Sequence, residues 1–305
     1  MISSSCPGAN ERAHQEYVRA AICGREKIAA ESSAIIISPK RGVPQRRTLA
    51  YMQFLVGTAG WTVPKQHLPL FSAAAEGGKV PHLQRYANRL PCVEINSSFH
   101  RPHRRTTWER WAAMTPSDFR LAVKAPKAIT HTAGLVNTDN ALLEFFDAVG
   151  ALGKKLGPVL IQLPPKLAFN ESVAQDFFIK LRRLHQGGVV LEPRHPSWFS
   201  PRVETLLQSF QIARVAADPP KGSELAGQPG GWPGLCYWRL HGTPRTYYSE
   251  YDVHWLSEFA ERLRLLAGCS WTKEVWVIFD NTVLGHAIAN AVWLEDALRQ
   301  ERTRG

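Results

Sequence analysis

Residues 159–192 read VLIQLPPKLAFNESVAQDFFIKLRRLHQGGVVLE, and this stretch contains one complete strand–helix–strand pattern. Two short apolar runs, residues 159–163 and 189–192, have the length and residue types of buried strands. Between them, apolar residues recur at helical spacing over residues 173–179. This order of elements predicts two neighbouring parallel strands that are joined by a helix.

The same alternation runs through most of the chain, from residue 54 to residue 298. It predicts a mostly parallel sheet with helices between its strands. Eight such units in about 250 residues are what a (β/α)8 TIM barrel requires, so we predict an α/β fold of that type. The eight predicted strands are residues 54–60, 92–98, 119–124, 159–163, 189–192, 212–218, 236–241 and 275–280.

Two segments refine this prediction. The first turn, GTAGW at residues 57–61, lacks the glycine-rich fingerprint that an open doubly wound sheet often carries after its first strand. Residues 219–235 contain five glycines and show no helical periodicity. We therefore predict a barrel in which a loop replaces one helix after the sixth strand.

The barrel domain accounts for residues 52–300, which leaves residues 1–51 as a basic extension. The Ser, Ala, Arg and Pro in this extension are typical of an appended or disordered segment. Met52 directly precedes the first predicted strand. We expect translation to start at Met52, and a genuine basic arm is the alternative.

The composition limits the possible cellular location and binding partners of the protein. No apolar run reaches the roughly 18 residues of a membrane helix, and the N-terminus lacks a signal-peptide core, so we expect a soluble cytoplasmic protein without membrane contact. The five cysteines are scattered, which predicts neither a disulfide framework nor a zinc ribbon. The net charge of +11, of which +4 lies in residues 1–51, favours an anionic partner such as a phosphate, a carboxylate or nucleic acid.

The predicted strands end in polar residues. In a TIM barrel the active site lies at these C-terminal ends of the strands. The i, i+2 spacing places Glu94, Asn96 and Ser98 on one face, and it places Arg239 and His241 on one face. The alternative is a buried ion-pair network that only stabilises the barrel. The large number of strands that end in polar residues favours a functional site instead. The candidate catalytic residues are Glu94, Glu192, His241 and Asp280, and the candidate substrate-binding residues are Trp61, Asn96, Lys124, Gln162, Arg194, Trp198, Arg239, Tyr248 and Asn281.

These strand ends also carry a family resemblance. The chain resembles the YecE-like family, a domain of unknown function, from residue 52 to residue 298. The resemblance implies a TIM barrel in a cytoplasmic bacterial or archaeal protein, and it supplies no activity and no catalytic residues. His100 departs from the family pattern, in which a Tyr is common. The matching motifs are GTAGW at 57–61, VEINSSFHRP at 93–102, KAPKAITH at 124–131, QLPP at 162–165, EPRHPSW at 192–198, RLHG at 239–242 and FDNT at 279–282.

We favour the hypothesis of an enzyme, a hydrolase or a lyase, that uses acid/base chemistry on a small anionic substrate and requires no cofactor. Glu94 and Glu192 come from different parts of the ring and could flank a substrate as proton donor and acceptor. Neighbouring cations would keep both carboxylates ionised, which argues against a proton donor of high pKa. Lys124, Arg194 and Arg239 would neutralise a phosphate or carboxylate, and Trp61, Trp198 and Tyr248 would stack on the substrate.

Two alternatives stay open. One is a phosphodiesterase or nuclease that depends on Mn²⁺, Mg²⁺ or Zn²⁺. Against it, the sequence has no compact metal-binding motif. In addition, Lys124, Arg194 and Arg239 at the same end of the barrel would repel a metal ion. The other is a non-catalytic module that binds nucleic acid by stacking and phosphate contacts, although no nucleic-acid-binding motif occurs. The candidate metal ligands are Glu94, Glu192, Asp218, His241 and Asp280.

Three histidines follow predicted strands and could act as bases or pack as neutral side chains. His131 and His195 fit either role equally well. His241 is favoured as a functional residue because it shares a strand face with Arg239.

Overall fold

The computed structural model describes residues 52–71, 80–267 and 272–299. The expectation that residues 1–51 form a disordered extension therefore lies outside the described residues. Within the described part, ten strands form one sheet in the order β7-β9-β10-β1-β2-β3-β4-β5-β6-β8, and every pairing is parallel except that of β6 with β8. The strands are β1 Gln53–Ala59, β2 Cys92–Ile95, β3 Arg120–Lys124, β4 Leu156–Gln162, β5 Val189–Glu192, β6 Ala213–Arg214, β7 Ala216–Asp218, β8 Gly230–Gly231, β9 Leu235–Leu240 and β10 Glu274–Phe279.

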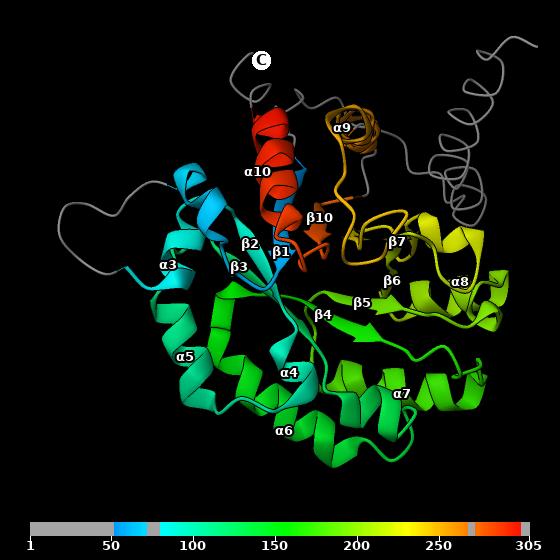
Figure 1. Ribbon diagram of the computed structural model, residues 1–305. Coiled ribbons are helices and arrows are strands. Elements are labelled where there is room, and N and C mark those ends of the chain that lie inside the picture. Colours follow the sequence, from blue (N-terminus) through cyan, green and yellow to red (C-terminus); the bar gives the residue numbers. More distant parts are fainter. Residues whose placement is uncertain (1–51, 72–79, 268–271, 300–305) are drawn as a thin grey trace, which may run out of the picture.

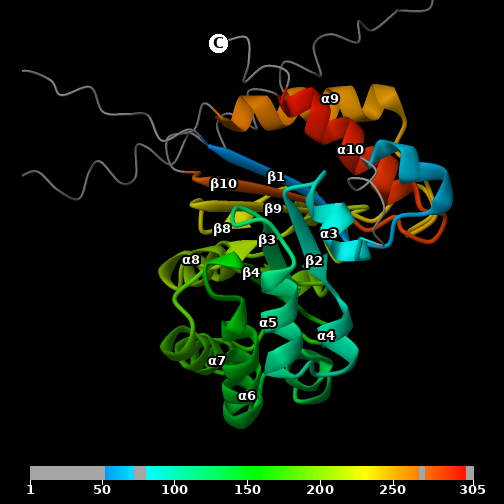
Figure 2. The same ribbon diagram turned by 90° about the vertical axis from the view of Figure 1, so that its left-hand side faces the viewer.

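The sixth predicted strand brings the two ends of the sheet together. Its first part, β6, pairs with β5, and its second part, β7, pairs with β9. Between them, the backbone N–H of Val215 donates to the carbonyl of Leu191 at 2.9 Å. The sheet therefore curves into a nearly closed, TIM-barrel-like structure (Figures 1 and 2).

The strand count differs from the prediction of eight for two local reasons. Residues 212–218 form two short strands because the pairing partner changes at Val215. In addition, β8 adds two residues that pair antiparallel with β6 inside the predicted loop. That loop otherwise holds only a 3-10 turn, η5 Glu224–Gly227, so the predicted replacement of a helix after the sixth strand is confirmed.

Helices follow the other strands and cover the outside of the barrel. Helices α5, α6 and α7 lie on one side of it, and α9 and α10 lie on the opposite side (Figures 1 and 2). None of the helices among the described residues is both long and apolar enough to cross a membrane. The α-helices are α3 His82–Ala87, α4 Ser97–His100, α5 Arg105–Ala113, α6 Asp139–Val149, α7 Glu171–Leu184, α8 Pro201–Ser209, α9 Val253–Ala267 and α10 His286–Arg299.

Helix α7 shows how the sequence produces these elements. Asn170 caps its N-terminus, where the side chain accepts a hydrogen bond from the backbone N–H of Val173 at 3.2 Å. Ala174, Phe177 and Leu181 recur at spacings of three and four residues and are buried. The helix therefore packs one apolar face on the sheet and leaves its charged face in solvent.

The inside of the barrel forms a separate core. Trp276 and Tyr237 stack there at a centroid distance of 6.0 Å, and they belong to a buried cluster with side chains such as Leu55, Leu160 and Val190. Side chains alternate across a strand, so Arg239 and His241 share the inward face of β9 with Tyr237. The apolar floor thus gives way to charged residues towards the C-terminal ends of the strands.

One local prediction was wrong. Residues 92–98 do not form a single strand, because β2 ends at Ile95 and α4 begins at Ser97. Asn96 and Ser98 therefore do not continue the face of Glu94. Asn and Ser favour helix starts over strand interiors, which explains the early end of the strand. The Ser98 hydroxyl instead donates to the carbonyl oxygen of Lys124 at 2.7 Å and ties α4 to β3.

Candidate functional site

Arg239 stands at the centre of a buried charged cluster, and its side chain is 1% exposed. Its Nη2 donates to Oε1 of Glu94 at 2.8 Å, and its Nε donates to Oε2 of the same carboxylate at 3.0 Å. Nη1 donates to Oε2 of Glu192, and Nη2 also donates to Oδ2 of Asp280, both at 2.9 Å. Strands β9, β2, β5 and β10 thus bring together one arginine and three carboxylates. We call these four residues, together with His241, the central cluster.

The charges of the central cluster shift the pKa values of Arg239, Glu192 and Asp280. Burial alone would lower the pKa of Arg239, but Glu94, Glu192 and Asp280 raise it well above its ordinary value. Burial would raise the pKa of Glu192, yet Arg239, His241 and Arg194 lower it well below the ordinary value. The pKa of Asp280 is likewise lowered, because Arg239 and His241 outweigh its burial. The cluster therefore contains ionised carboxylates at neutral pH.

His241 lies between two of these carboxylates. Its Nδ1 donates to Oδ2 of Asp280 at 3.0 Å, and its Nε2 is 3.7 Å from Oε1 of Glu192. Burial and Arg239 would lower the pKa of His241, but the hydrogen bonds to Asp280 and Glu192 raise it above its ordinary value. The ring edge of Tyr247 contacts the imidazole at a centroid distance of 5.6 Å. His241 is thus stabilised as an imidazolium.

Glu94 is closed off from solvent within the cluster. It is 0% exposed, and its Oε2 accepts a further hydrogen bond from the Tyr237 hydroxyl at 2.9 Å. Both of its oxygens are therefore occupied, and it serves to hold Arg239. Tyr237 was missed as a site residue, although its spacing of two residues from Arg239 and four from His241 is a signal that could have identified it.

Three adjacent strands end in polar residues at one side of the mouth, namely Lys124, Gln162 and Glu192. Nζ of Lys124 donates to Oε1 of Gln162 at 2.6 Å and lies 4.3 Å from the ring centroid of Phe99. Nη2 of Arg194 donates to Oε1 of Glu192 at 2.9 Å, and its side chain is 18% exposed. Phe99 is a second contact that sequence reasoning missed, because the helix that carries it replaced an expected strand.

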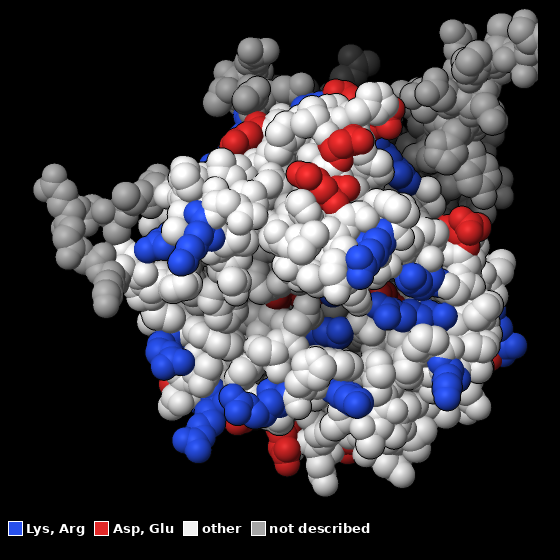
Figure 3. All heavy atoms as spheres, in the orientation of Figure 1, with Lys and Arg blue, Asp and Glu red and all other residues white. Residues whose placement is uncertain are grey.

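Positive charge gathers at this side. Burial lowers the pKa of His131, and the charges of Lys124, Arg194 and Lys127 lower it further. We call Lys124, Lys127 and Arg194 the rim cations. Figure 3 shows several Lys and Arg side chains around a hollow near the middle of the face that it draws.

Several predicted site residues are not brought into the central cluster. Trp61 packs edge-on against Trp111 at 5.1 Å, and the ring of Tyr248 lies 3.8 Å from the Arg245 guanidinium. Asn281 is 0% exposed and donates to Ser249 O at 3.0 Å and Asn290 Oδ1 at 2.9 Å. Asn96 lies between β2 and α4 as the residue that precedes the helix. His195 bonds Oγ of Ser197 through Nδ1 at 2.8 Å.

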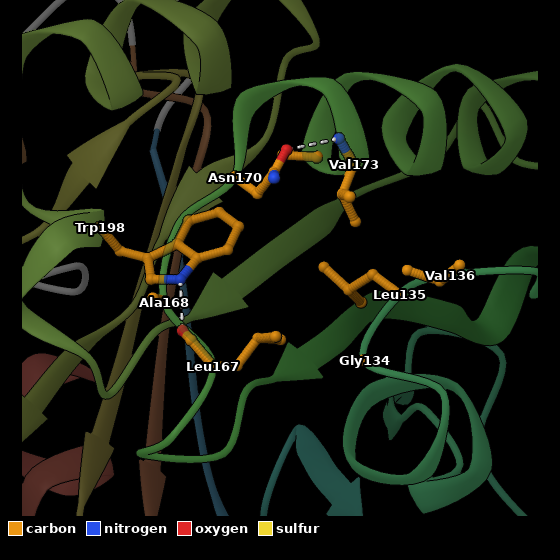
Figure 4. Close-up of a pocket in the computed structure, with 9 residues that line it drawn as sticks. Gly134, Leu135, Val136, Leu167, Ala168, Asn170, Val173 and Trp198 are labelled. Atoms are coloured by element: carbon orange, nitrogen blue, oxygen red, sulfur yellow. Dashed lines mark hydrogen bonds between the residues drawn. The ribbon is translucent and has the colours of Figure 1, made fainter.

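Trp198 belongs to a separate apolar pocket. It is 1% exposed, and its indole N–H donates to the carbonyl of Leu167 at 2.9 Å. The pocket has a volume of about 150 Å³ and is lined mainly by apolar residues of the loops after β3 and β4 and the start of α7 (Figure 4). Leu135 and Val173 face it from two of these segments.

The residues proposed as metal ligands do not assemble into a metal site. Asp218 accepts hydrogen bonds from the hydroxyls of Tyr251 at 2.6 Å and Thr243 at 2.8 Å. The remaining carboxylates are bonded to Arg239. In the part of the chain that the structure describes, no three His, Cys, Asp or Glu side chains form a group that could hold a metal ion.

Comparison with known proteins gives the same family at the level of sequence and of fold. Residues 55–304 match the model of a family described as "Protein of unknown function DUF72". The chain is 31% identical over 122 residues to the UPF0759 protein YecE of Escherichia coli K12, a match that covers 40% of this chain and 44% of that protein. It is 32% identical over 169 residues to the UPF0759 protein YunF of Bacillus subtilis 168, covering 52% of this chain and 56% of that protein.

These matches span about half the length of each relative. Among solved structures, a DUF72 family protein of Enterococcus faecalis V583 has a TM-score of 0.66 at 20% identity, covering 81% of this chain and 95% of that one. A DUF72 family protein of Thermotoga maritima MSB8 has a TM-score of 0.63 at 23% identity, covering 81% and 99%. The YecE-like resemblance predicted from the motifs is thereby confirmed, and so is the fold.

Proposed function

This chain belongs to the DUF72 family, and we propose that it is an enzyme that binds a small anionic substrate at the C-terminal mouth of its barrel and exchanges a proton with it through the His241–Asp280 pair. The rim cations bind the anionic group of the substrate. The central cluster transfers the proton and stabilises the charge that develops.

The distribution of charge carries the binding part of the proposal. The three carboxylates of the central cluster are all bonded to Arg239, and Glu192 is also bonded to Arg194. Lys124 instead donates to a neutral amide, so no carboxylate among the described residues forms an ion pair with it. A half-buried ammonium group without a counter-ion favours an anion as its natural partner.

The geometry of His241 supports the proton-transfer part. The imidazolium is held by Asp280, and both hydrogen bonds to that carboxylate fall on Oδ2. Oδ1 accepts no hydrogen bond from the described residues, and the side chain is 12% exposed, so a substrate can approach this oxygen. Arg239 and Arg194 lower the pKa of Glu192, so this carboxylate serves to fix the cations rather than to donate a proton. Both oxygens of Glu94 are occupied by Arg239 and Tyr237.

Calorimetric titration with inorganic phosphate tests this proposal. The native protein should bind phosphate, and the Lys124→Gln and Arg194→Gln variants should each lose at least about tenfold in affinity, because each removes a charge-assisted contact. Lys154→Gln and Arg183→Gln are the matched controls, since both side chains are exposed on segments that precede strands and so lie at the other end of the barrel. Equal losses in all four variants would contradict a local anion site.

The nucleic-acid alternative predicts a different result in the same experiment. A stacking platform on an extended basic surface would bind mixed single-stranded DNA more tightly than phosphate, with a steep salt dependence. The small-molecule proposal predicts that phosphate competes and that single-stranded DNA binds no better than the free anion. The metal-dependent alternative lacks a suitable group of ligands in the described residues, and no step is assigned to it.

A further inference from the structure

Lys124 has surroundings that differ from those of the other rim cations. It is the last residue of β3, and its amine lies on the ring of Phe99 while it donates to the neutral Gln162. The side chain is half-buried, so its amine is partly desolvated. A lysine amine that is partly desolvated and lies near another cation is activated as a nucleophile, and Arg239 is that cation for Lys124.

The charged groups that face Lys124 come from four strands. Burial and the neighbouring charge of Arg239 lower the pKa of its amine to about 8, against the opposing charges of Glu94, Glu192 and Asp280. His131 also faces it, because the charge of Lys124 lowers the pKa of that imidazole. At pH 7.5, roughly two hundred times more of Lys124 is in the free-amine form than of an ordinary lysine.

We propose that the Nζ of Lys124 is a nucleophile that forms a Schiff base with a small aldehyde or ketone bearing a carboxylate or a phosphate. This inference rests on the proposed anion-binding mouth and specifies its substrate class as an anionic carbonyl compound. Arg194 and Lys127 would hold the anionic group, which places the carbonyl carbon within reach of Lys124.

The step balances without an oxidant or a reductant. The lone pair of Nζ attacks the carbonyl carbon and forms the C–N bond, while the π electrons of the carbonyl move to its oxygen. The carbinolamine then expels that oxygen as water, and the nitrogen lone pair forms the C=N bond. Nζ loses two protons and the departing oxygen gains two, for which His241 is the acid available in the central cluster.

Reductive trapping tests the inference on the full-length protein. The protein is incubated with sodium cyanoborohydride and glyoxylate, glycolaldehyde phosphate or the neutral glycolaldehyde, and peptide mass mapping locates the adducts. Both anionic aldehydes are minimal members of their class, so a site for anionic carbonyl compounds should admit at least one of them. We expect the Lys124 adduct to form at least about tenfold faster than any other lysine adduct with an anionic aldehyde, and we expect a smaller preference with glycolaldehyde, which lacks the anionic group that Arg194 and Lys127 would hold.

Two variants complete the design. Lys124→Arg retains the positive charge but should lose the preferred adduct, whereas Lys154→Arg should keep it. Inorganic phosphate should slow the labelling of Lys124 and leave exposed lysines unaffected. If phosphate binds to both the native protein and Lys124→Arg but no preferred adduct forms with either anionic aldehyde, the Schiff-base inference is wrong and the proposed anion site stands. If phosphate does not bind the native protein, the proposed function itself is contradicted.

Discussion

Arg239 and Glu94, which lie 145 positions apart in the chain, form a two-point ion pair inside the barrel. The Nη2–Oε1 distance is 2.8 Å, and the two side chains are 1% and 0% exposed. Such a pair costs much desolvation, so it contributes little net stability compared with an apolar replacement of both partners. Removal of one partner is different, because the remaining charges stay buried without compensation.

The variant Arg239→Met should therefore be strongly destabilised. Glu94, Glu192 and Asp280 would lose their shared counter-ion, and we expect the free energy of unfolding to fall by at least about 3 to 5 kcal/mol. Urea denaturation measures the change. The control is Arg105→Met, which removes the exposed contacts with Glu109 and Asp147 and should have a much smaller effect. A loss in Arg239→Met as small as that of the control would contradict the buried network.

Tyr237→Phe should produce a smaller but clear loss. The substitution removes the hydroxyl that donates to Oε2 of Glu94 at 2.9 Å and leaves the ring stacked on Trp276. The carboxylate oxygen cannot be rehydrated at this depth, so we expect a loss of about 1 to 3 kcal/mol in unfolding free energy. Tyr248→Phe is the matched control, because that ring contacts Arg245 at the surface side of the mouth. Equal effects of the two substitutions on the free energy of unfolding would show that the hydrogen bond from Tyr237 to Glu94 makes no particular contribution to stability.

Periodicity predicted much of the site because it depends on local rules. The apolar run of β5 was predicted at its observed bounds, Val189–Glu192, and the i, i+2 spacing of Arg239 and His241 placed both on one face, where the two side chains lie 3.5 Å apart. The C-terminal ends of parallel strands meet at one edge, so the gathering of Glu94, Glu192 and Asp280 followed from the barrel prediction.

The choice of partners could not be predicted in this way. Asp218 ends its strand like Asp280, but it bonds Tyr251 and Thr243, which both follow β9, the strand that pairs with β7. Asn96 left the predicted face because β2 stops at Ile95. These outcomes depend on how strands far apart in sequence close the barrel, and no local pattern encodes that closure.

Gly57 in the first motif has a structural role that substitution can expose. A Cβ at this position would lie 2.1 Å from the backbone oxygen of Cys92 on the neighbouring strand. Gly57→Ala should force β1 and β2 apart and cost about 3 kcal/mol or more, measured as a lower thermal midpoint. At Gly150 the same Cβ would meet no atom within 4 Å, so Gly150→Ala should be neutral or slightly stabilising. Similar midpoints for the two variants would rule out the close approach of the strands.

The raised pKa of His241 predicts how stability depends on pH. Its hydrogen bonds to Asp280 and Glu192 favour the protonated form in the folded protein, so its contribution to stability is fully present below the ordinary value of 6.5. This contribution is lost as the pH rises through the raised pKa that His241 has in the folded protein. The pKa values of Asp280 and Glu192 are lowered instead, so their contributions to stability are lost as the pH falls. The difference in unfolding free energy between the native protein and His241→Gln should therefore shrink as the pH rises above the ordinary value of 6.5. The exposed His82→Gln should show no such trend. An NMR titration of the native protein measures the His241 pKa directly, and a value at or below the ordinary one would contradict the imidazolium assigned to the central cluster.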